Sequence, residues 1–336
     1  MLDPTDGPLC DRHDLVMLDL DGVVYVGGDA VPGAPEHLAR VRGSGVRCAF
    51  VTNNASRPPA VVADHLTRLG VQAAPEDVVT SAQAAARLLH RRFAAGSPVA
   101  VLGAPALEEE VRSAGLEPVG VDDDDAVALV TGYGPEVLWR EVMRAAVRVR
   151  DGLPWVASNT DGSIPTPYGT APGHGVLVET IQRFAGRDPE VAGKPAPPLL
   201  EETIERAGAT RPLMVGDRLD TDIAGGAAVG VPTLLVMTGV TGVAELVAAE
   251  PAERPTHLAA DLGGLLEEHP RVVDGASGGW RARVDGERLV VEGGGGADDW
   301  WRVVASAAWR HRDDGGAVPD TVHLDPPQPR AAGAPG

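Results

Sequence analysis

The stretch Leu15–Gly22 reads Leu-Val-Met-Leu-Asp-Leu-Asp-Gly, and it places two carboxylates directly after a run of apolar residues. Four consecutive apolar residues are typical of a β-strand that is buried on both faces. Because side chains alternate along a strand, Asp19 and Asp21 lean to the same side of its carboxyl end, where their charges repel each other. A hard cation such as Mg²⁺ would relieve that repulsion. An isolated Asp-x-Asp-Gly is also typical of a solvated turn, so residues elsewhere in the chain are needed to distinguish a metal site from a turn.

The composition argues against several classes of protein. The chain has 336 residues, enough for two or more domains, and 43% of them are hydrophobic, as in soluble globular proteins. Its net charge of -19 argues against nucleic acid or an anionic membrane as a partner, since both bind basic surfaces. No apolar run approaches the ~20 residues of a membrane span. The first residues lack the basic region of a secretion signal, so a cytoplasmic location is expected.

Strands and helices alternate along most of the chain. Predicted helices separate apolar strands at 46–51, 99–103, 126–130, 211–216 and 233–237. This alternation is typical of an α/β fold with a doubly wound parallel sheet and helices on both faces. In such a sheet the site lies beyond the carboxyl ends of the strands, where the strand order reverses.

Several polar residues are expected at that same edge of the sheet. Thr52 and Asn53 follow the second predicted strand, and Asp217 follows a later one. Lys194, the only lysine among 29 basic residues, directly precedes a predicted helix. A compact ammonium fits between a carboxylate and a phosphate where a planar guanidinium does not. With Mg²⁺, this set of carboxylates, hydroxyl, amide and lysine is chemically complete for phosphate monoester transfer.

These residues resemble the four motifs of the haloacid dehalogenase-like (HAD) hydrolase superfamily. In order, the motifs are Asp19-Leu20-Asp21-Gly22, Thr52-Asn53-Asn54, Gly193-Lys194-Pro195 and Gly216-Asp217-Arg218-Leu219-Asp220-Thr221-Asp222. The residues of the second motif, and the position of the segment inserted between the second and third motifs, resemble those of subfamily IIA, the NagD-like phosphatases with a C2-type cap. The resemblance covers roughly residues 14–247 and implies a Rossmann-like core.

The resemblance implies a role for each motif residue. Asp19 is the expected nucleophile and a Mg²⁺ ligand, and Asp21 is the expected general acid and base, whose backbone carbonyl also ligates Mg²⁺. The residues expected to hold the phosphoryl group are Gly22, Thr52, Asn53 and Lys194. Asp217 completes the expected metal site, with Asp222 as a ligand or behind a water molecule. Spacing alone does not separate Asp222 from Asp220, although the family's Thr-Asp pair favours Asp222.

Substrate choice is expected to come from the cap. The loop Asn159–Pro167 is the candidate specificity element, although turn chemistry alone would also account for it. The candidate substrate-binding residues are Asn54, Asn159, Asp161 and Thr166. His174, between two glycines at a helix start, is expected to be a capping or solvated residue rather than a catalytic one.

The predicted domains are a HAD core at 1–81 and 189–265, an α/β C2-type cap at 82–188, a small α+β C-terminal module at 266–315 and a disordered tail at 316–336. The module combines a hairpin, turning at Asp285-Gly286, with a helix at 298–312. Four of the six tryptophans fall in the last quarter of the chain, which predicts a separate core there.

The resemblance implies a Mg²⁺-dependent phosphatase that hydrolyses a small phosphate monoester through an aspartyl-phosphate intermediate. NagD-like enzymes with such an appendage resemble glycerol 3-phosphate phosphatases, which favours glycerol 3-phosphate over 2-phosphoglycolate, pyridoxal 5′-phosphate or a nucleotide. A non-catalytic phosphometabolite-binding protein and a phosphomutase stay open as alternatives. A homodimer is also left open.

Overall fold

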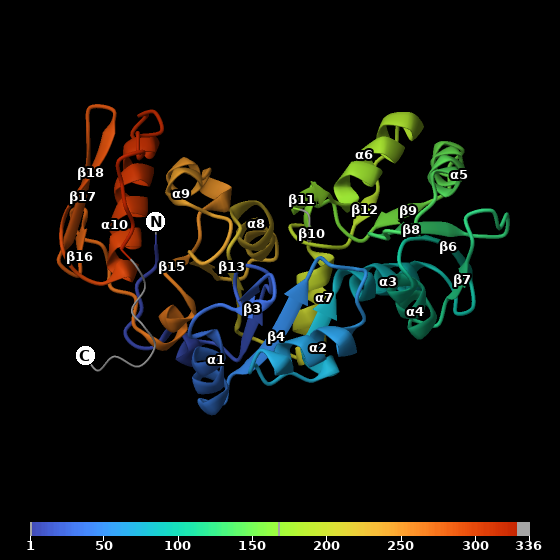
Figure 1. Cartoon of the computed structure of the whole chain (residues 1–336), viewed down its shortest axis with the longest axis horizontal. Coiled ribbons are helices and arrows are strands. Elements are labelled where there is room, and N and C mark those ends of the chain that lie inside the picture. The colour runs from blue at the N-terminus through green and yellow to red at the C-terminus, as the bar shows by residue number, and fades with distance from the viewer. Residues whose placement is uncertain (1, 167–168, 328–336) are drawn as a thin grey trace. The chain divides into compact units, whose positions relative to one another are not determined.

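The computed structural model describes residues 2–166 and 169–327, which form two compact units (Figure 1). The first unit comprises Met1–Phe50, Leu66–Gln72 and Ile204–Gly336, and the second comprises Val51–His65 and Ala73–Thr203. The predicted cap, residues 82–188, falls entirely in the second unit, which also holds the second and third sequence motifs. The predicted domain bounds themselves stay a prediction.

A parallel sheet forms the centre of the first unit. In sheet order, the first five of its six strands are β15 (His257–Ala259), β14 (Thr233–Val236), β13 (Pro212–Gly216), β1 (Leu15–Leu18) and β4 (Arg47–Thr52). β1 pairs with two neighbours, so that Leu15 lies opposite both Pro212 and Arg47. The order reverses at β1, because the chain adds β4 on one side and β13, β14 and β15 on the other. This confirms the predicted doubly wound parallel sheet and places its reversal at the first motif.

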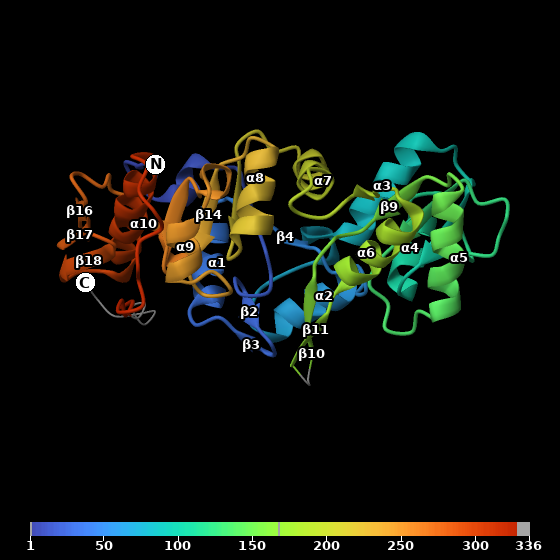
Figure 2. The same ribbon diagram turned by 90° about the horizontal axis from the view of Figure 1, so that it is seen from above.

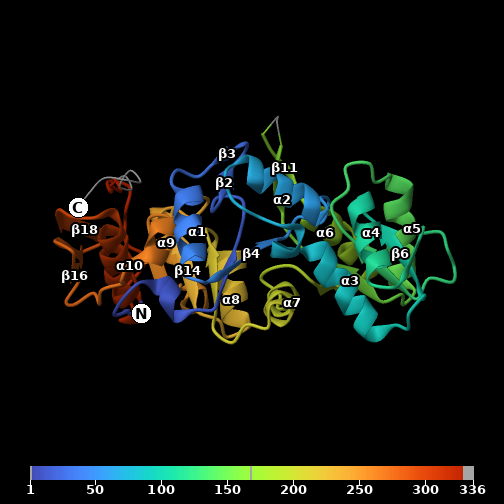
Figure 3. The ribbon, with the colours of Figure 1, turned by 90° about the horizontal axis from the view of Figure 1, so that it is seen from below.

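Buried apolar side chains account for the position of β1. Its four residues are each at most 1% exposed, as expected for a strand that is covered on both faces. In Figure 3, α1 (Ala34–Gly43) lies over one face of the sheet, and Figure 2 shows α8 (Ala224–Ala228) and α9 (Val243–Ala248) over the other. Shorter elements complete the unit: η1 (Leu9–Arg12), β2 (Tyr25–Val26), β3 (Asp29–Ala30), η3 (Leu219–Ile223), η4 (Pro251–Glu253) and η5 (Leu262–Leu266).

The second unit has a parallel sheet of its own. Its order is β12 (Glu190–Val191), β9 (Trp155–Ala157), β8 (Ala128–Thr131), β6 (Pro98–Leu102) and β7 (Glu117–Val119). α5 (Trp139–Arg150) and α6 (His174–Ala185) cover one face, and α3 (Ser81–Arg92) and α4 (Pro105–Ser113) lie on the other (Figure 1). The remaining elements are η2 (Pro75–Asp77) and β5 (Val78–Thr80), with α2 (Pro59–Arg68) and α7 (Pro198–Ala207) spanning unit boundaries.

The predicted specificity loop includes the first strand of a hairpin that was not predicted from the sequence. β10 (Ser163–Thr166) pairs antiparallel with β11 (Gly169–Pro172). Proline and glycine are depleted in strands, which is why this proline- and glycine-rich segment gives a loop signal. Pro167, the last residue of the predicted loop, lies outside the described residues.

The C-terminal segment forms a three-stranded antiparallel sheet and one long helix. The elements are β16 (Ala276–Ser277), β17 (Trp280–Asp285), β18 (Arg288–Gly293) and α10 (Ala297–Asp313). Asp285 pairs with Arg288, so the two turn residues are Gly286 and Glu287, one position later than predicted. Gly286 has φ +62°, which suits the first central position of a two-residue hairpin turn. In the described part of the chain, no helix has the length and apolar character needed to cross a bilayer.

The tryptophans of α10 do not form the separate core predicted from the sequence. Trp300, Trp301 and Trp309 are at most 6% exposed, and they share one apolar cluster with Leu246 of α9 and Leu258 of β15. The indole Nε1 of Trp309 donates to Leu246 O at 2.8 Å. The C-terminal helix therefore completes the core of the first unit.

Part of the segment predicted to be a disordered tail has defined backbone hydrogen bonds. Asp320 N donates to Glu287 O at 2.7 Å, and Leu289 N donates to Asp320 O at 3.1 Å. Residues 328–336 of the predicted tail lie outside the described residues.

We expect the first unit to lose stability in mild acid. Burial lowers the pKa of His257 and of His269 to about 4, against about 6.5 in an unfolded chain. As the pH falls, the unfolded state therefore binds protons first, which costs about 2 kcal/mol for each histidine by pH ~5. Burial raises the pKa of Asp298 to about 6, which offsets about 1 kcal/mol because this carboxyl binds its proton first in the folded state.

Urea unfolding at about pH 7.5 and about pH 5 measures this effect. The expected loss of unfolding free energy is about 3 kcal/mol. The Asp298→Asn variant removes the carboxyl that opposes the effect, so it is expected to lose more stability over the same pH interval. Arg302 lies beside both His269 and Asp298 and keeps its contact with His269 in this variant. Equal stability of the parent at the two pH values would contradict the prediction.

Candidate active site

Three carboxylates gather in the first unit at the carboxyl ends of β1 and β13. Asp19 follows β1, Asp217 follows β13, and Asp222 lies on η3, the short π-helical turn after β13. One oxygen from each residue lies within 4.8 Å of the other two. Asp217 and Asp222 are almost fully buried. Carboxylates this close repel one another, so the arrangement favours a bound cation.

Glycines make room for this carboxylate cluster. Gly22 has φ +84°, and a Cβ atom there would lie 2.5 Å from Asp217 Oδ2. A Cβ on Gly239 would also overlap the carboxylate of Asp217, and one on Gly216 would overlap that of Asp222. At these three positions, only glycine leaves room for the carboxylates. A compact, all-oxygen donor set of this kind fits a hard ion such as Mg²⁺.

A loop after β14, whose role was not predicted from the sequence, contacts this half of the site. Val240 N donates to Asp217 Oδ2 at 2.6 Å, and Thr241 Oγ1 donates to Asp217 O at 2.6 Å. Thr238 Oγ1 donates to Gly22 O at 2.5 Å. A sequence signal was present, because small and polar residues follow a buried strand here as they do after β1 and β13.

The structure separates the aspartates whose spacing left their roles open. Asp220 is exposed, and its carboxylate accepts hydrogen bonds from Arg218 Nε at 3.1 Å and Nη2 at 2.8 Å. Asp222, not Asp220, belongs to the carboxylate cluster. Asp21 is exposed in the turn after β1, where Gly22 N donates to Tyr25 O at 2.8 Å.

A pair of matched variants tests the prediction that Asp222, and not Asp220, is a metal ligand. We expect Asp222→Asn to weaken Mg²⁺ binding at least ~10-fold, because the carboxylate cluster loses one charged group. Asp220→Asn makes the same chemical change outside the cluster and is expected to stay within ~2-fold of the parent. Isothermal titration with Mg²⁺ measures both, and equal affinities in the two variants would contradict the assignment.

In the second unit, Asn53 is the centre of a buried polar cluster. Its Nδ2 donates to Lys194 O at 2.9 Å and to Asp161 Oδ1 at 3.0 Å, and its Oδ1 accepts from Lys194 N at 2.8 Å. Its backbone carbonyl accepts from Asn159 Nδ2 at 2.7 Å. The structure therefore brings together the second motif, the third motif and the start of the predicted specificity loop.

These hydrogen bonds decide which groups can still bind a phosphoryl oxygen. Both hydrogens of the Asn53 carboxamide are used within the protein, so its backbone N–H is the donor that this residue can offer. Thr52 Oγ1 accepts from Asn54 N at 3.1 Å, which leaves the hydroxyl hydrogen to donate. A Cβ on Gly193 would lie 2.6 Å from Asn53 Oδ1, which explains the glycine before Lys194.

Lys194 is a buried cation, 2% exposed. Its Nζ donates to Val51 O at 3.3 Å, and an ammonium group has three hydrogens to donate. A buried charge is costly unless it is paired and hydrogen-bonded. The burial of Lys194 therefore requires polar or anionic groups around its ammonium group.

The candidate substrate-binding residues have different surroundings. Asn159 Oδ1 accepts from Asp161 N at 3.1 Å, so its carboxamide ties the loop to Asn53. Asn54 Oδ1 accepts from Ser56 N and Ser56 Oγ, each at 2.8 Å. Thr166 Oγ1 donates to Gly169 O at 2.5 Å within its own hairpin. None of these contacts tests substrate binding, which stays a prediction for all four residues.

His174 is not the capping or solvated residue predicted from the sequence. It is 3% exposed, and its Nε2 lies 3.2 Å from Thr131 Oγ1, which accepts from Trp155 Nε1 at 3.1 Å. Burial lowers the pKa of His174 to about 4. The flanking glycines explain the burial, because a Cβ on either would meet the backbone of residues 160–163.

Comparison with known proteins identifies similar sequences and structures. Residues 16–117 match the family described as haloacid dehalogenase-like hydrolase, and residues 191–265 match the HAD-hydrolase-like family. D-glycerol 3-phosphate phosphatase of Mycobacterium tuberculosis is 42% identical over 313 residues, covering 90% of this chain and 88% of that protein. Acid sugar phosphatase of Staphylococcus aureus is 32% identical over 259 residues, covering 76% of this chain and 98% of that protein.

Solved phosphatase structures are also similar to this chain. The crystal structure of glycerol phosphate phosphatase from Mycobacterium tuberculosis in complex with magnesium matches with a TM-score of 0.83 and 42% identity, covering 90% of this chain and 92% of that one. 4-Nitrophenylphosphatase from Thermotoga maritima matches with a TM-score of 0.71 and 29% identity, covering 77% of this chain and 98% of that one.

Proposed function

Because the chain belongs to the haloacid dehalogenase-like hydrolase family, we propose that it is a Mg²⁺-dependent phosphatase of small phosphate monoesters, with glycerol 3-phosphate as its preferred substrate. The observation that carries this proposal is the cluster of Asp19, Asp217 and Asp222, with one oxygen from each within 4.8 Å of the others. A magnesium complex of a 42% identical phosphatase supports the choice of metal.

In the proposed mechanism, Asp19 is the nucleophile. One of its carboxylate oxygens forms a bond to phosphorus as the bond from phosphorus to the ester oxygen breaks, and Asp21 protonates the leaving alkoxide. Asp21 then takes a proton from a water molecule, which attacks the aspartyl-phosphate and releases inorganic phosphate. Asp19 is thereby regenerated. The exposed position of Asp21 in the turn after β1 supports this proton exchange.

Asp19, Asp217 and Asp222 would hold Mg²⁺, which, when bound, offsets the repulsion between these carboxylates and the substrate phosphate. Thr52 Oγ1, the backbone N–H of Asn53 and Lys194 Nζ orient the phosphoryl oxygens in this proposal. The two hydrogen bonds between the Asn53 carboxamide and the Lys194 backbone support it, because they fix these donors relative to one another.

The preference for glycerol 3-phosphate rests on the names of similar proteins, one of them a D-glycerol 3-phosphate phosphatase. The other candidate substrates are 2-phosphoglycolate, pyridoxal 5′-phosphate and a nucleotide. In the proposal, the segment with Asn159, Asp161 and Thr166, together with Asn54, contacts the part of the substrate that carries no phosphate.

A phosphate-release screen tests the function. Purified chain is incubated with each of the four candidate substrates, with Mg²⁺ and with excess chelator. We expect Mg²⁺-dependent release of phosphate, fastest from glycerol 3-phosphate. Binding without release would show a non-catalytic binding protein, and isomer formation without free phosphate would show a phosphomutase. Either outcome would overturn the proposal.

The other partner predictions belong to this proposal as well. The proposed partner is a small phosphate ester, and neither nucleic acid nor a membrane is expected to bind at a net charge of -19. The homodimer and the cytoplasmic location also stay predictions, and light scattering of the purified chain tests the former.

A further inference from the structure

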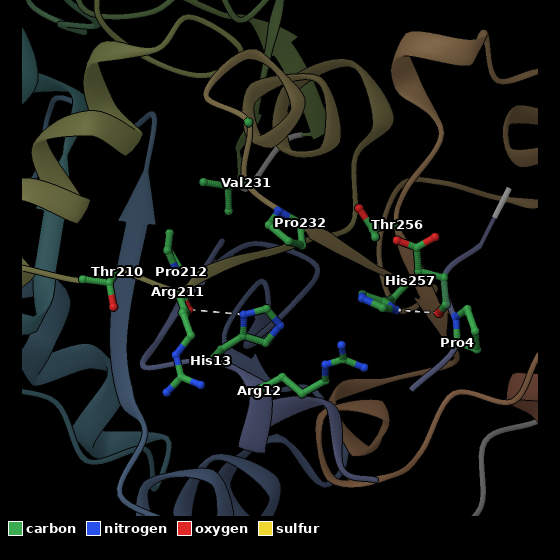
Figure 4. Close-up of a pocket in the computed structure, with 12 residues that line it drawn as sticks. Pro4, Arg12, His13, Thr210, Arg211, Pro212, Val231, Pro232, Thr256 and His257 are labelled. Carbon is green, nitrogen blue, oxygen red and sulfur yellow. Dashed lines mark hydrogen bonds between the residues drawn. The ribbon is translucent and has the colours of Figure 1, made fainter. Parts of the chain in front are cut away.

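A cavity of about 450 Å³ lies in the first unit, at the edge of the sheet opposite to the carboxylate cluster (Figure 4). Its wall contains residues at or just before the amino ends of four strands: His13 (before β1), Pro212 (β13), Pro232 (before β14) and His257 (β15). The strands are parallel, so their carboxyl ends, which carry the candidate active site, lie at the other edge. The cavity is therefore a separate feature of the molecule.

The wall of the cavity is cationic, although the whole chain has a net charge of -19. Arg12 and Arg211 line it, and Asp3 is the only acidic residue of the wall within the described part of the chain. Asp14, which accepts hydrogen bonds from Thr210 and from Arg211 N, offsets part of the Arg211 charge from outside the wall. In Figure 4, the two arginine side chains extend to either side of the His13 ring. The donor geometry of a guanidinium group matches phosphate and carboxylate oxygens.

Two histidines of the wall provide hydrogen-bond acceptors. His13 Nδ1 lies 3.2 Å from Arg211 O, and His257 Nδ1 lies 3.1 Å from Asp3 O. A carbonyl oxygen can only accept, so each Nδ1 carries the hydrogen and each Nε2 keeps a lone pair. Burial lowers the pKa of both histidines, and the positive charges of Arg12 and Arg211 lower that of His13 further. Both rings are therefore neutral at pH 7.

The rest of the wall suits a small organic molecule. Pro4, Val231 and Pro232 contribute apolar surface. Thr256 Oγ1 accepts from Thr233 N at 3.1 Å, which leaves its hydroxyl hydrogen to donate. The volume lies within the range of about 300–1,000 Å³ that is typical of small-molecule sites.

We propose that this cavity binds a small organic anion that combines one oxyanion group, phosphate or carboxylate, with at least one hydroxyl group. Arg12 and Arg211 bind the oxyanion through charge-assisted hydrogen bonds. His13 Nε2 and His257 Nε2 accept hydrogen bonds from the ligand's hydroxyl groups. The ligand does not displace the substrate, because the two sites lie at opposite edges of the sheet.

Calorimetric titration of the full chain with Mg²⁺ tests the proposal and separates the two oxyanions. D-glycerate is the carboxylate probe and inorganic phosphate is the phosphate probe. The test variant is Arg12→Gln/Arg211→Gln. Its matched control, Arg40→Gln/Arg68→Gln, removes the same charge from exposed positions of α1 and α2. All four positions are exposed, and thermal unfolding of each variant verifies that it folds.

If the site takes carboxylates, glycerate binds the parent and the control, and binds the test variant at least ~10-fold more weakly. If it takes phosphates, inorganic phosphate fills two sites in the parent and control, one of them catalytic, and one in the test variant. Propionate, which lacks the hydroxyl groups, is expected to bind at least ~10-fold more weakly than glycerate. The proposal is overturned if neither probe distinguishes the test variant from the control, or if glycerate binds the parent and propionate binds it as tightly.

Discussion

Asp19→Asn is expected to abolish phosphate release from glycerol 3-phosphate, lowering kcat by at least ~10⁴-fold. The amide keeps the size of the carboxylate, but it is a poor nucleophile and removes one negative charge from the metal cluster with Asp217 and Asp222. The measurement is free phosphate released at saturating Mg²⁺. Asp220→Asn is the matched control, because Asp220 pairs with Arg218 on the surface, and it is expected to keep activity within ~2-fold of the parent.

A second measurement separates the nucleophile from a mere metal ligand. With 4-nitrophenyl phosphate, whose leaving group needs no protonation, Asp21→Asn is expected to release a burst of one nitrophenol per chain and then turn over slowly, because water is no longer activated. Asp19→Asn is expected to give no burst. A burst in Asp19→Asn, or substantial steady release of phosphate, would exclude Asp19 as the nucleophile.

Lys194→Arg is expected to lower kcat/KM at least ~100-fold although the positive charge is kept. Lys194 is 2% exposed, and its backbone is held on both sides by the carboxamide of Asn53, so the longer and planar guanidinium has no room to place a donor at the same point. Initial rates with glycerol 3-phosphate give kcat/KM.

Two controls interpret this result. Lys194→Met keeps the length of the side chain and removes its charge, so it separates loss of geometry from loss of charge. Arg40→Lys, at an exposed position on α1, makes the reverse exchange where no precise geometry is required and is expected to match the parent. If Lys194→Arg has the kcat/KM of the parent, the inference that arginine cannot replace lysine at this position is wrong.

The sequence was sufficient for much of the carboxylate cluster because its signals are local. Each buried strand is a short apolar run, and the residue after it lies at the carboxyl edge of a parallel sheet whatever the loops do. Asp19 and Asp217 follow from this rule alone. The hairpin of β17 and β18 was predictable for the same reason, although its turn lies one residue later than the Asp-Gly signal predicts.

The sequence could not assign side chains whose roles depend on distant partners. Asp220 and Asp222 are equivalent by spacing, and only the path of η3 turns one into the cluster and the other toward Arg218. Asn53 was expected to bind phosphate, yet its carboxamide meets a backbone more than a hundred residues away. Hydrogen-bond partners of this kind depend on which segments meet in space, and no local pattern encodes that.

By itself, the sequence determined the α/β class, the strand that begins the sheet and the residue types of a phosphate-transfer site, because hydrophobic periodicity and strand-end chemistry are properties of short segments. Only the tertiary structure decided that Trp309 completes the core of the first unit, that the loop around Val240 holds Asp217, and that Arg12 and Arg211 line one cavity. These features join residues far apart in the chain, and their contacts form only when the sheet brings the ends of its strands together.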